Sequence, residues 1–238
     1  MKEVRPRMSE AEYKAFLEFR QKKNNVLVIG DLHAPFIKEG YLEFCKEMYT
    51  KHQCSSVVFT GDILDFHYSS FHESDADGFG AGEELKRAKN VIAQFYEAFP
   101  NAKVCIGNHD RIPNRKAFAG GLSMTWVKTI SEVLDTPNWA YADRFIIDNV
   151  MYCHGDGMDI RRRSNLESIS VVSGHFHSKS FYETYVGENI LRFVLQIGCG
   201  IDRHSYAMAY AKLYPKQQIN VGIVKDDGRW GMIEHMVM

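Results

Sequence analysis

Five short motifs place carboxylate, imidazole and amide side chains directly after apolar, strand-like runs of the chain. In order along the sequence they are Asp31-Leu32-His33, Gly61-Asp62-Ile63-Leu64-Asp65, Gly107-Asn108-His109-Asp110, His154-Gly155 and Gly174-His175-Phe176-His177. Because ligands of α/β sheets bind at strand ends, we expect these side chains to share one site. The motifs contain no cysteine, so their ligands suit Mn, Fe, Zn, Co or Ni and argue against a structural zinc site built on thiolates. The motifs therefore favour a catalytic metal site.

Asp62 follows the apolar run 57–60, and the glycine after this run predicts a buried strand that ends in a loop. By itself this stretch could equally be an ordinary strand-to-loop turn. A short carboxylate in this place can also bridge two cations about 3.5 to 4 Å apart, as in two-metal hydrolases. The spacing of His175 and His177, on an extended segment, would send both imidazoles to one side, where they could serve two neighbouring ions. Taken alone, that pair could also be surface histidines.

The expected order of secondary structure is a series of βα units followed by β-hairpins. Buried strands are expected at 26–29, 57–60 and 103–106, with amphipathic helices at 9–22, 41–49, 83–99 and 123–134. Paired strands are expected at 144–147 with 150–153, then at 169–172, 181–186 and 190–197, and finally at 221–225 with 230–235 around Asp227-Gly228. Two sheets packed face to face with helices outside would accommodate this order.

Length and composition indicate a globular protein. With 238 residues, 45% hydrophobic and 25% charged, and a net charge of -1, the chain can bury one core, and its overall charge favours no polyanion. We expect residues 1–25 to form an N-terminal helical extension, which Ser9 and Glu12 begin as a capping box, and residues 26–238 to form a single domain. The odd number of cysteines, five, predicts reduced thiols and a cytoplasmic location. Neither a signal peptide nor a membrane span is expected.

In this order and at these strand ends, the motifs D-x-H, G-D-x-x-D, G-N-H-D, H and G-H-x-H resemble those of the calcineurin-like metallophosphoesterases, and they span residues 31–177. The resemblance implies an α/β fold that forms a four-layer α/β/β/α sandwich with two mixed β-sheets. It also implies two divalent metal ions as cofactors, with Mn expected first and Fe, Zn, Ni, Co or Mg as alternatives. One ion would be held by Asp31, His33, Asp62 and His177, and the second by Asp62, Asn108, His154 and His175.

The resemblance also implies a mechanism, in which a metal-bound hydroxide attacks phosphorus in line. His109 would be the general acid toward the leaving oxygen, and Asp65 would orient it, although Asp65 could simply cap the turn. Protein Ser/Thr phosphatases of this family carry arginine at the position of Phe66 and usually Glu at the position of Asp110. The chain is therefore similar instead to compact bacterial and phage-encoded members.

The expected substrate is a phosphodiester, first of all in nucleotides or nucleic acid, with small phosphomonoesters as the alternative. A non-catalytic scaffold that keeps the fold is a further alternative, which the presence of His109 and of every expected ligand disfavours. Candidate substrate contacts are Asn108, Arg111, His67 and His72. Other side chains could contact phosphates or bases, or could be solvated or packed: Arg115, Arg161, Arg162, Arg163, Phe66, Tyr68 and Phe71. The oligomeric state is left open.

Overall fold

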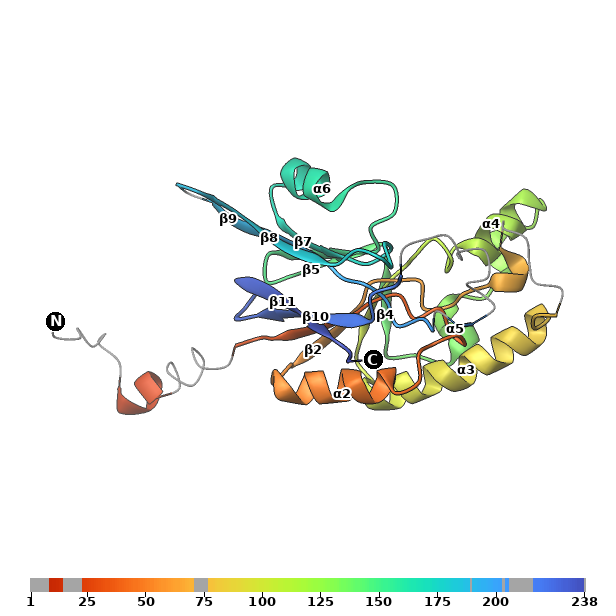
Figure 1. Cartoon of the computed structure of the whole chain (residues 1–238), viewed down its shortest axis with the longest axis horizontal. Helices are drawn as coiled ribbons and strands as arrows, with labels where there is room; N and C mark the ends of the chain where they lie inside the picture. The colour runs from red at the N-terminus through yellow and green to blue at the C-terminus, as the bar shows by residue number, and fades with distance from the viewer. Residues whose placement is uncertain are drawn as a thin grey trace.

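The computed structural model describes residues 9–14, 23–70, 77–188, 190–202, 204–205 and 216–237. Two mixed β-sheets pack face to face, with helices on both outer faces (Figure 1). The first sheet has the order β11 (Trp230–His235), β10 (Asn220–Lys225), β1 (Val26–Ile29), β2 (Ser56–Phe59), β3 (Lys103–Cys105) and β4 (Ala140–Ala142). The second has the order β5 (Arg144–Ile147), β6 (Val150–Cys153), β7 (Ser170–Ser173), β9 (Ile190–Gln196) and β8 (Phe181–Gly187). The predicted four-layer α/β/β/α sandwich is confirmed.

Parallel strands form the centre of each sheet. Strands β1, β2, β3 and β4 run parallel to their neighbours, and β10 and β11 extend this sheet with antiparallel pairing. In the second sheet β6, β7 and β9 are parallel, while β5 and β8 pair antiparallel at the edges. Because parallel neighbours end at the same edge of a sheet, the loops after β1, β2 and β3 lie side by side, as do those after β6 and β7.

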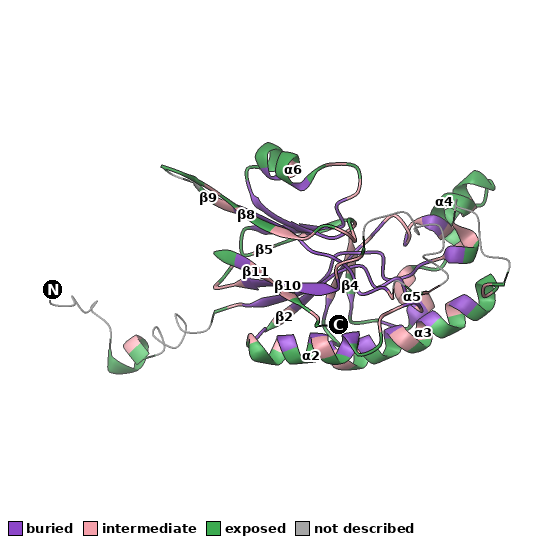
Figure 2. Cartoon of the chain, in the orientation of Figure 1, coloured by how far each residue is buried: buried purple, intermediate pink, exposed green. Residues whose placement is uncertain are grey.

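The central strands are apolar throughout because both of their faces are buried. In β1, Val26 and Val28 face the core between the sheets, whereas Leu27 and Ile29 face the helices α2 (Tyr41–Lys51) and α3 (Ala81–Ala98). Strand β6 divides its side chains in the same way between the inter-sheet core and the helix α6 (Ile160–Glu167). Figure 2 shows the central strands buried and the outer helices exposed on their far sides, whereas edge strands such as β8 and β11 are partly exposed. Three apolar layers thus hold the strand ends in place.

The helix expected at 123–134 is instead a 3₁₀ turn, η2 (Met124–Trp126), followed by a short helix, α5 (Ile130–Leu134). Thr129 begins α5 with a capping box: Glu132 N donates to the Thr129 hydroxyl at 3.3 Å, and Thr129 N donates to the Glu132 carboxylate at 2.8 Å. The sequence-based prediction also lacks α4 (Ile112–Ala119), α6 and β4. Both helices bury few side chains, so they lack the apolar stripe that indicates a helix.

Two local predictions near the chain ends can be compared with the structure. Residues 10–14 are helical, and Ser9 N donates to the Glu12 carboxylate at 2.8 Å, so the expected capping box is present. The rest of the expected helical extension, 15–22, lies outside the described residues. The hairpin of β10 and β11 turns at Asp227 and Gly228, with φ values of 58° and 77°, as predicted. In the described parts of the chain, no helix is long and apolar enough to cross a membrane.

Candidate metal centre

The structure brings the five sequence motifs together where strands of both sheets end. Strands β1, β2, β3, β6 and β7 each lead into one of the loops that carry Asp31, His33, Asp62, Asn108, His154, His175 and His177. The backbone joins these loops directly: His33 N donates to Asp62 O at 2.9 Å, and Gly174 N donates to His154 O at 3.0 Å. Residues far apart in the sequence therefore share one site.

Asp31, His33 and His177 form one group of possible metal ligands. Nε2 of His177 lies 3.1 Å from Oδ2 of Asp31 and 3.1 Å from Nε2 of His33. Two imidazole nitrogens that face each other at this distance need a proton or another positive charge between them. Donors that share one ion, each at about 2.0 to 2.2 Å, lie about 3 Å from one another. The spacing of this group therefore fits a divalent cation.

Asp62, His154 and His175 form a second group. Nε2 of His154 lies 3.1 Å from Oδ2 of Asp62, 3.0 Å from Nδ1 of His175 and 2.9 Å from Oδ1 of Asn108. The same oxygen of Asp62 lies 3.9 Å from Nε2 of His33, which belongs to the first group. Asp62 thus stands between the two groups, in the place that a carboxylate bridging two ions needs.

Hydrogen bonds behind the histidines fix the direction in which their rings point. Oδ1 of Asp65 lies 2.7 Å from Nδ1 of His33, and the backbone oxygen of Thr60 lies 3.0 Å from Nδ1 of His154. Each bond occupies the rear nitrogen and leaves Nε2 facing the other donors. In metal sites such partners fix the tautomer and raise the basicity of the ligand. The rings are therefore held ready for a cation.

Two buried carboxylates give the site a negative field. Asp31 and Asp62 are 0% and 2% exposed, and buried carboxylates are rare unless they are paired or bind a metal. Burial disfavours a charged His154, yet the carboxylates of Asp62 and Asp31 outweigh burial and raise the pKa of His154 to about 10. Burial also opposes ionisation of Asp62, but His154 beside it holds the pKa of Asp62 well below the usual range. The site therefore attracts positive charge.

Two glycines allow the carboxylates to lie against the backbone. A Cβ on Gly107 would collide with Oδ1 of Asp62, and a Cβ on Gly174 would collide with Oδ1 of Asp31. Asp62 itself has a φ of 47°, in the left-handed region that few residues other than glycine adopt. Strain of this kind is typical of functional sites that the surrounding structure holds in place.

His175 and His177 belong to different groups of donors, but the extended segment expected between them is wrong. His175 has a φ of 73°, which is a left-handed turn and not a strand. The backbone N of His175 donates to Oδ2 of Asp31 at 3.0 Å, and this bond holds the turn. The two imidazoles therefore point to separate groups because the backbone turns sharply between them.

His109 lies edge-on to His33, with ring centroids 4.7 Å apart. Nδ1 of His109 lies 2.5 Å from the backbone oxygen of Asp65, so Nδ1 is a donor, and the protonated ring carries on Nε2 the second proton that it can give. Asp65 thus contacts His109 through its backbone, while its carboxylate bonds His33. Burial opposes a charge on His109, but the carboxylate of Asp62 and the bond to Asp65 raise the pKa of His109 above its usual value.

Asp110 is a residue of the site whose role was missed from the sequence. Its buried carboxylate accepts hydrogen bonds from Gly107 N at 2.9 Å and from Leu64 N at 3.3 Å. Burial and the neighbouring charge of Asp62 raise the pKa of Asp110 to about 7. The side chain ties the loop after β2 to the loop after β3. Its one sequence signal is its place after His109 in the third motif.

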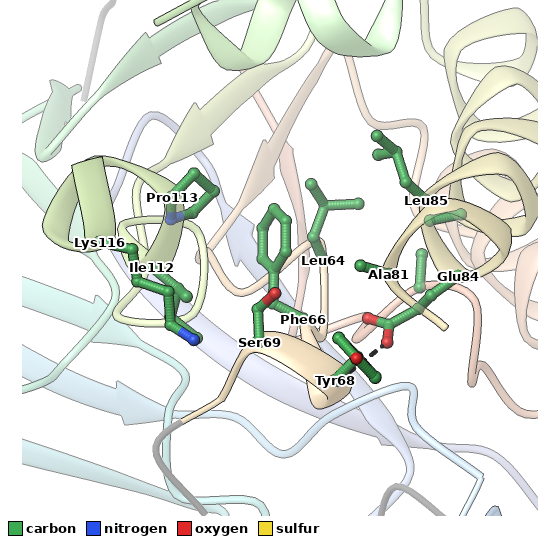
Figure 3. Close-up of a pocket in the computed structure, with 12 residues that line it drawn as sticks. Leu64, Phe66, Tyr68, Ser69, Ala81, Glu84, Leu85, Ile112, Pro113 and Lys116 are labelled. Carbon is green, nitrogen blue, oxygen red and sulfur yellow. Dashed lines mark hydrogen bonds between the residues drawn. The ribbon is translucent and has the colours of Figure 1, made fainter. Parts of the chain in front are cut away.

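The loop after Asp65 forms a 3₁₀ turn, η1 (His67–Ser69), beside α3 and α4. Buried Glu84 of α3 holds this turn, because its carboxylate accepts from His67 N at 2.9 Å and from Tyr68 N at 3.1 Å. An apolar pocket of about 220 Å³, whose lining includes Phe66, lies between η1, α3 and α4 (Figure 3). Sequence reasoning missed Glu84, because a glutamate in a helical pattern usually faces solvent.

Replacing Glu84 with alanine is expected to lower the free energy of unfolding by about 1 to 3 kcal/mol, because it leaves the amides of η1 without their acceptor. Urea denaturation measures this loss. The matched control is Glu83→Ala, one residue earlier in α3, whose exposed carboxylate pairs with Arg87 at 2.7 Å. Such a pair contributes about 0.3 to 0.5 kcal/mol. Equal losses in the two variants would contradict the anchoring role of Glu84.

The candidate residues after Asp65 have different surroundings. His67 is 5% exposed, and its ring lies edge-on to Phe36, with ring centroids 6.5 Å apart. It is therefore not a solvated loop histidine. His72 and Phe71 lie outside the described residues.

The candidate arginines make ion pairs at the surface. Arg111 pairs with Asp143 at 3.0 Å and with Asp156 at 3.2 Å, and its side chain is 32% exposed. Arg161 pairs with Glu183 of β8 at 2.8 Å, which ties α6 to the second sheet. Arg111 thus lies near the loop after His154, whereas the contact of Arg161 favours a structural role.

Comparisons with known proteins place the chain in a family of phosphoesterases. The family model described as calcineurin-like phosphoesterase matches residues 25–198, more than half of the chain. A search of curated proteins found no match. Matching solved structures include Vacuolar Protein Sorting 29 from Cryptosporidium parvum (13% identity, covering 91% of this chain and 99% of that chain, TM-score 0.47). They also include Yfce, a phosphoesterase from E. coli (12%, 84% and 87%, TM-score 0.40), and nuclease MPE from Pseudomonas putida (15%, 72% and 72%, TM-score 0.35).

The match to the family model covers all five motifs, from Asp31 to His177. The same motifs supply the buried aspartates and histidines that converge at the strand ends and suit divalent metal ions. The chain is therefore a metal-dependent hydrolase, and it belongs to the calcineurin-like phosphoesterase family.

Proposed function

We propose that the protein is a dinuclear phosphodiesterase that acts on nucleotides or nucleic acid. The observation that carries this proposal is the position of Asp62, whose carboxylate stands between two groups of buried donors, 3.1 Å from His154 and 3.9 Å from His33. His109 is held beside the same carboxylate, since its backbone N donates to Oδ1 of Asp62 at 2.8 Å. Paired metal positions with a proton donor at one side are what in-line phosphoester hydrolysis needs.

We assign the residues of the site the following tasks. Asp31, His33, Asp62 and His177 would hold one divalent ion, and Asp62, Asn108, His154 and His175 the other. Bound ions would supply a hydroxide nucleophile at neutral pH and neutralise the phosphate oxygens, and Mn is the metal that we expect. His109 would give the proton on Nε2 to the leaving oxygen. The backbone oxygen of Asp65, which bonds Nδ1, would keep Nε2 turned toward that leaving oxygen.

The charges around the site support a diester in preference to a monoester. A monoester is a dianion, and holding its additional charge would require cations that face the phosphate. Phe66 occupies a position where arginine would supply such a charge, and it lines an apolar pocket. Arg111 remains a proposed phosphate contact, with Asn108 and His67, but its pairs with Asp143 and Asp156 offset part of its charge, so it is a weak partner for a second phosphate charge. A singly charged diester therefore matches the site better.

The buried cysteines support the predicted cytoplasmic location. All five cysteines are free and buried. Burial raises the pKa of both Cys54 and Cys153 to about 11, so these thiols resist ionisation and oxidation at neutral pH. Free thiols of this kind suit a reducing compartment.

We expect bis-p-nitrophenyl phosphate to be hydrolysed with a kcat/KM at least about fivefold above that of p-nitrophenyl phosphate, at one Mn concentration. The reason is that the second negative charge of a monoester needs a further cation, and a pair of opposite charges about 4 Å apart contributes about 1 kcal/mol even in water. Both substrates release the same nitrophenolate, so the leaving group does not cause the difference. A higher kcat/KM for the monoester would show that the protein is a phosphomonoesterase instead.

A further inference from the structure

The segment that follows the catalytic motif of His109 has an unusual charge. Residues 111–128, which we call the α4–η2 arm, contain four cations, Arg111, Arg115, Lys116 and Lys128, and no acidic residue. Four of the chain's 29 Lys and Arg residues thus lie in this stretch of 18 residues without an acid to balance them in sequence, although the chain as a whole has a net charge of -1. A cluster of this kind attracts a polyanion by its local field, whatever the net charge of the protein.

The same arm exposes large apolar side chains. Phe118 and Trp126 are both 80% exposed, and Leu122 and Met124 are 49% and 44% exposed. All of the residues from 118 to 126, from the end of α4 through the following turn to η2, are exposed, and Figure 2 shows the exposed side of α4. Aromatic rings this open to solvent contribute little to the core, and such a concentration typically marks a binding surface.

An open groove of about 400 Å³ runs beside the arm. Its lining includes Phe118 and Met124 together with Arg111, Arg115 and one acid, Asp143, which pairs with Arg111 at 3.0 Å. Arg111 connects the groove to the candidate metal centre, because it follows His109 by two residues and pairs with Asp156, two residues after His154. A phosphate chain that leaves the metal centre would therefore meet arginine first and aromatic rings next.

We propose that the α4–η2 arm binds single-stranded nucleic acid, with Phe118 and Trp126 stacking on bases and the cations contacting phosphates. This inference rests on the proposed phosphodiesterase function and names the substrate as a polymer and not a free nucleotide. Alternating cations and open aromatic rings are how proteins bind single strands without reading their sequence. A double helix would not serve, because its bases are already stacked and offer no free face to a ring.

The charge of the arm argues against a second copy of this chain as its occupant. A two-fold interface brings the same patch of both copies together, which would place four cations against four cations. A nucleic acid brings negative charge and flat apolar faces in one ligand, and this combination matches both features of the arm.

The test is binding of a fluorescein-labelled oligothymidylate of about 20 nucleotides, longer than the site of one binding module. Binding is measured without divalent metal, so that the oligonucleotide stays intact. Phe118→Ala/Trp126→Ala is expected to raise the Kd at least about fivefold for each ring removed, and added salt is expected to weaken binding by the wild type. The kcat/KM for bis-p-nitrophenyl phosphate should stay unchanged, because neither ring belongs to the metal centre.

Three matched double variants show whether stacking is the cause. Leu166→Ala/Val186→Ala removes side chains that are 65% and 78% exposed, on α6 and β8, and is expected to leave the Kd unchanged. Phe118→Tyr/Trp126→Phe keeps aromatic faces and is expected to bind like the wild type, whereas Phe118→Leu/Trp126→Leu keeps apolar area without them and is expected to bind like the alanine variant.

Several results would overturn the inference while leaving the phosphodiesterase intact. One is an unchanged Kd in Phe118→Ala/Trp126→Ala. Another is full binding by the leucine variant, which would mean apolar docking. A dimer in light scattering that the alanine variant dissociates would identify a second copy as the occupant, and binding to vesicles of anionic lipid but not to the oligonucleotide would identify a membrane surface. The opposite outcome is also possible: the wild type does not hydrolyse diesters, but Phe118→Ala/Trp126→Ala still weakens oligonucleotide binding. That outcome would support nucleic-acid binding by the arm and refute the proposed phosphodiesterase function.

Discussion

His109→Ala is expected to slow cleavage of a dinucleotide by about 10² to 10⁴-fold, the usual contribution of general acid catalysis. The same change should scarcely alter hydrolysis of bis-p-nitrophenyl phosphate, because nitrophenolate is a good leaving group that needs almost no proton. A nucleoside alkoxide is a poor leaving group and needs the proton that Nε2 of His109 can give. Steady-state kinetics on both substrates, with one enzyme preparation, measures the contrast.

Metal content is the control for this variant. The bond between the backbone N of His109 and Oδ1 of Asp62, at 2.8 Å, does not depend on the imidazole, so alanine should leave Asp62 in place. Equal losses on both substrates at full metal content would mean that His109 positions the phosphate. A loss of metal together with activity would mean that its ring supports His33, to which it lies edge-on at 4.7 Å.

Asp62→Asn is expected to lower metal affinity at both positions by at least about 10 to 100-fold, and to remove activity on every phosphoester. Replacing a residue that only hydrogen-bonds to a metal ligand already lowers metal affinity by this factor, and Asp62 is placed to bind both ions directly. Asparagine keeps the shape and one oxygen of the side chain, so the bond from His109 N can persist while the bridging charge is lost. Elemental analysis of the purified variant measures both positions together.

His177→Ala is the matched comparison, because His177 belongs to the first group of donors alone. We expect this variant to lose chiefly one ion and Asp62→Asn to lose two. The assignment of Asp62 as the bridge would be wrong if Asp62→Asn and the wild type bound the same amount of Mn with the same affinity.

Much of the fold could be predicted because the central strands are buried on both faces. The run from Val26 to Ile29 is apolar without interruption, and the structure shows why: alternate side chains enter two different cores. The motif residues directly follow such runs, so their position at strand ends could be read from the sequence. The helices α4 and α6 could not be predicted from the sequence, because they bury few side chains and carry no apolar stripe.

The finer geometry of the site depends on backbone conformations that side-chain patterns do not report. The left-handed turn at His175 arises from its bond to Asp31, a residue 144 positions away. Asp65 was expected to orient His109, but the sequence could not show that its backbone does so while its carboxylate holds His33. Asp110 likewise gains its role only when the loops after β2 and β3 lie together.

Electron paramagnetic resonance of the Mn-loaded wild type shows whether two ions share the carboxylate of Asp62. Ions bridged at about 3.5 to 4 Å are coupled to each other, so we expect about two equivalents of Mn per chain and the spectrum of an exchange-coupled pair. A single equivalent, or two equivalents that show only the hyperfine spectrum of isolated Mn, would contradict a dinuclear centre.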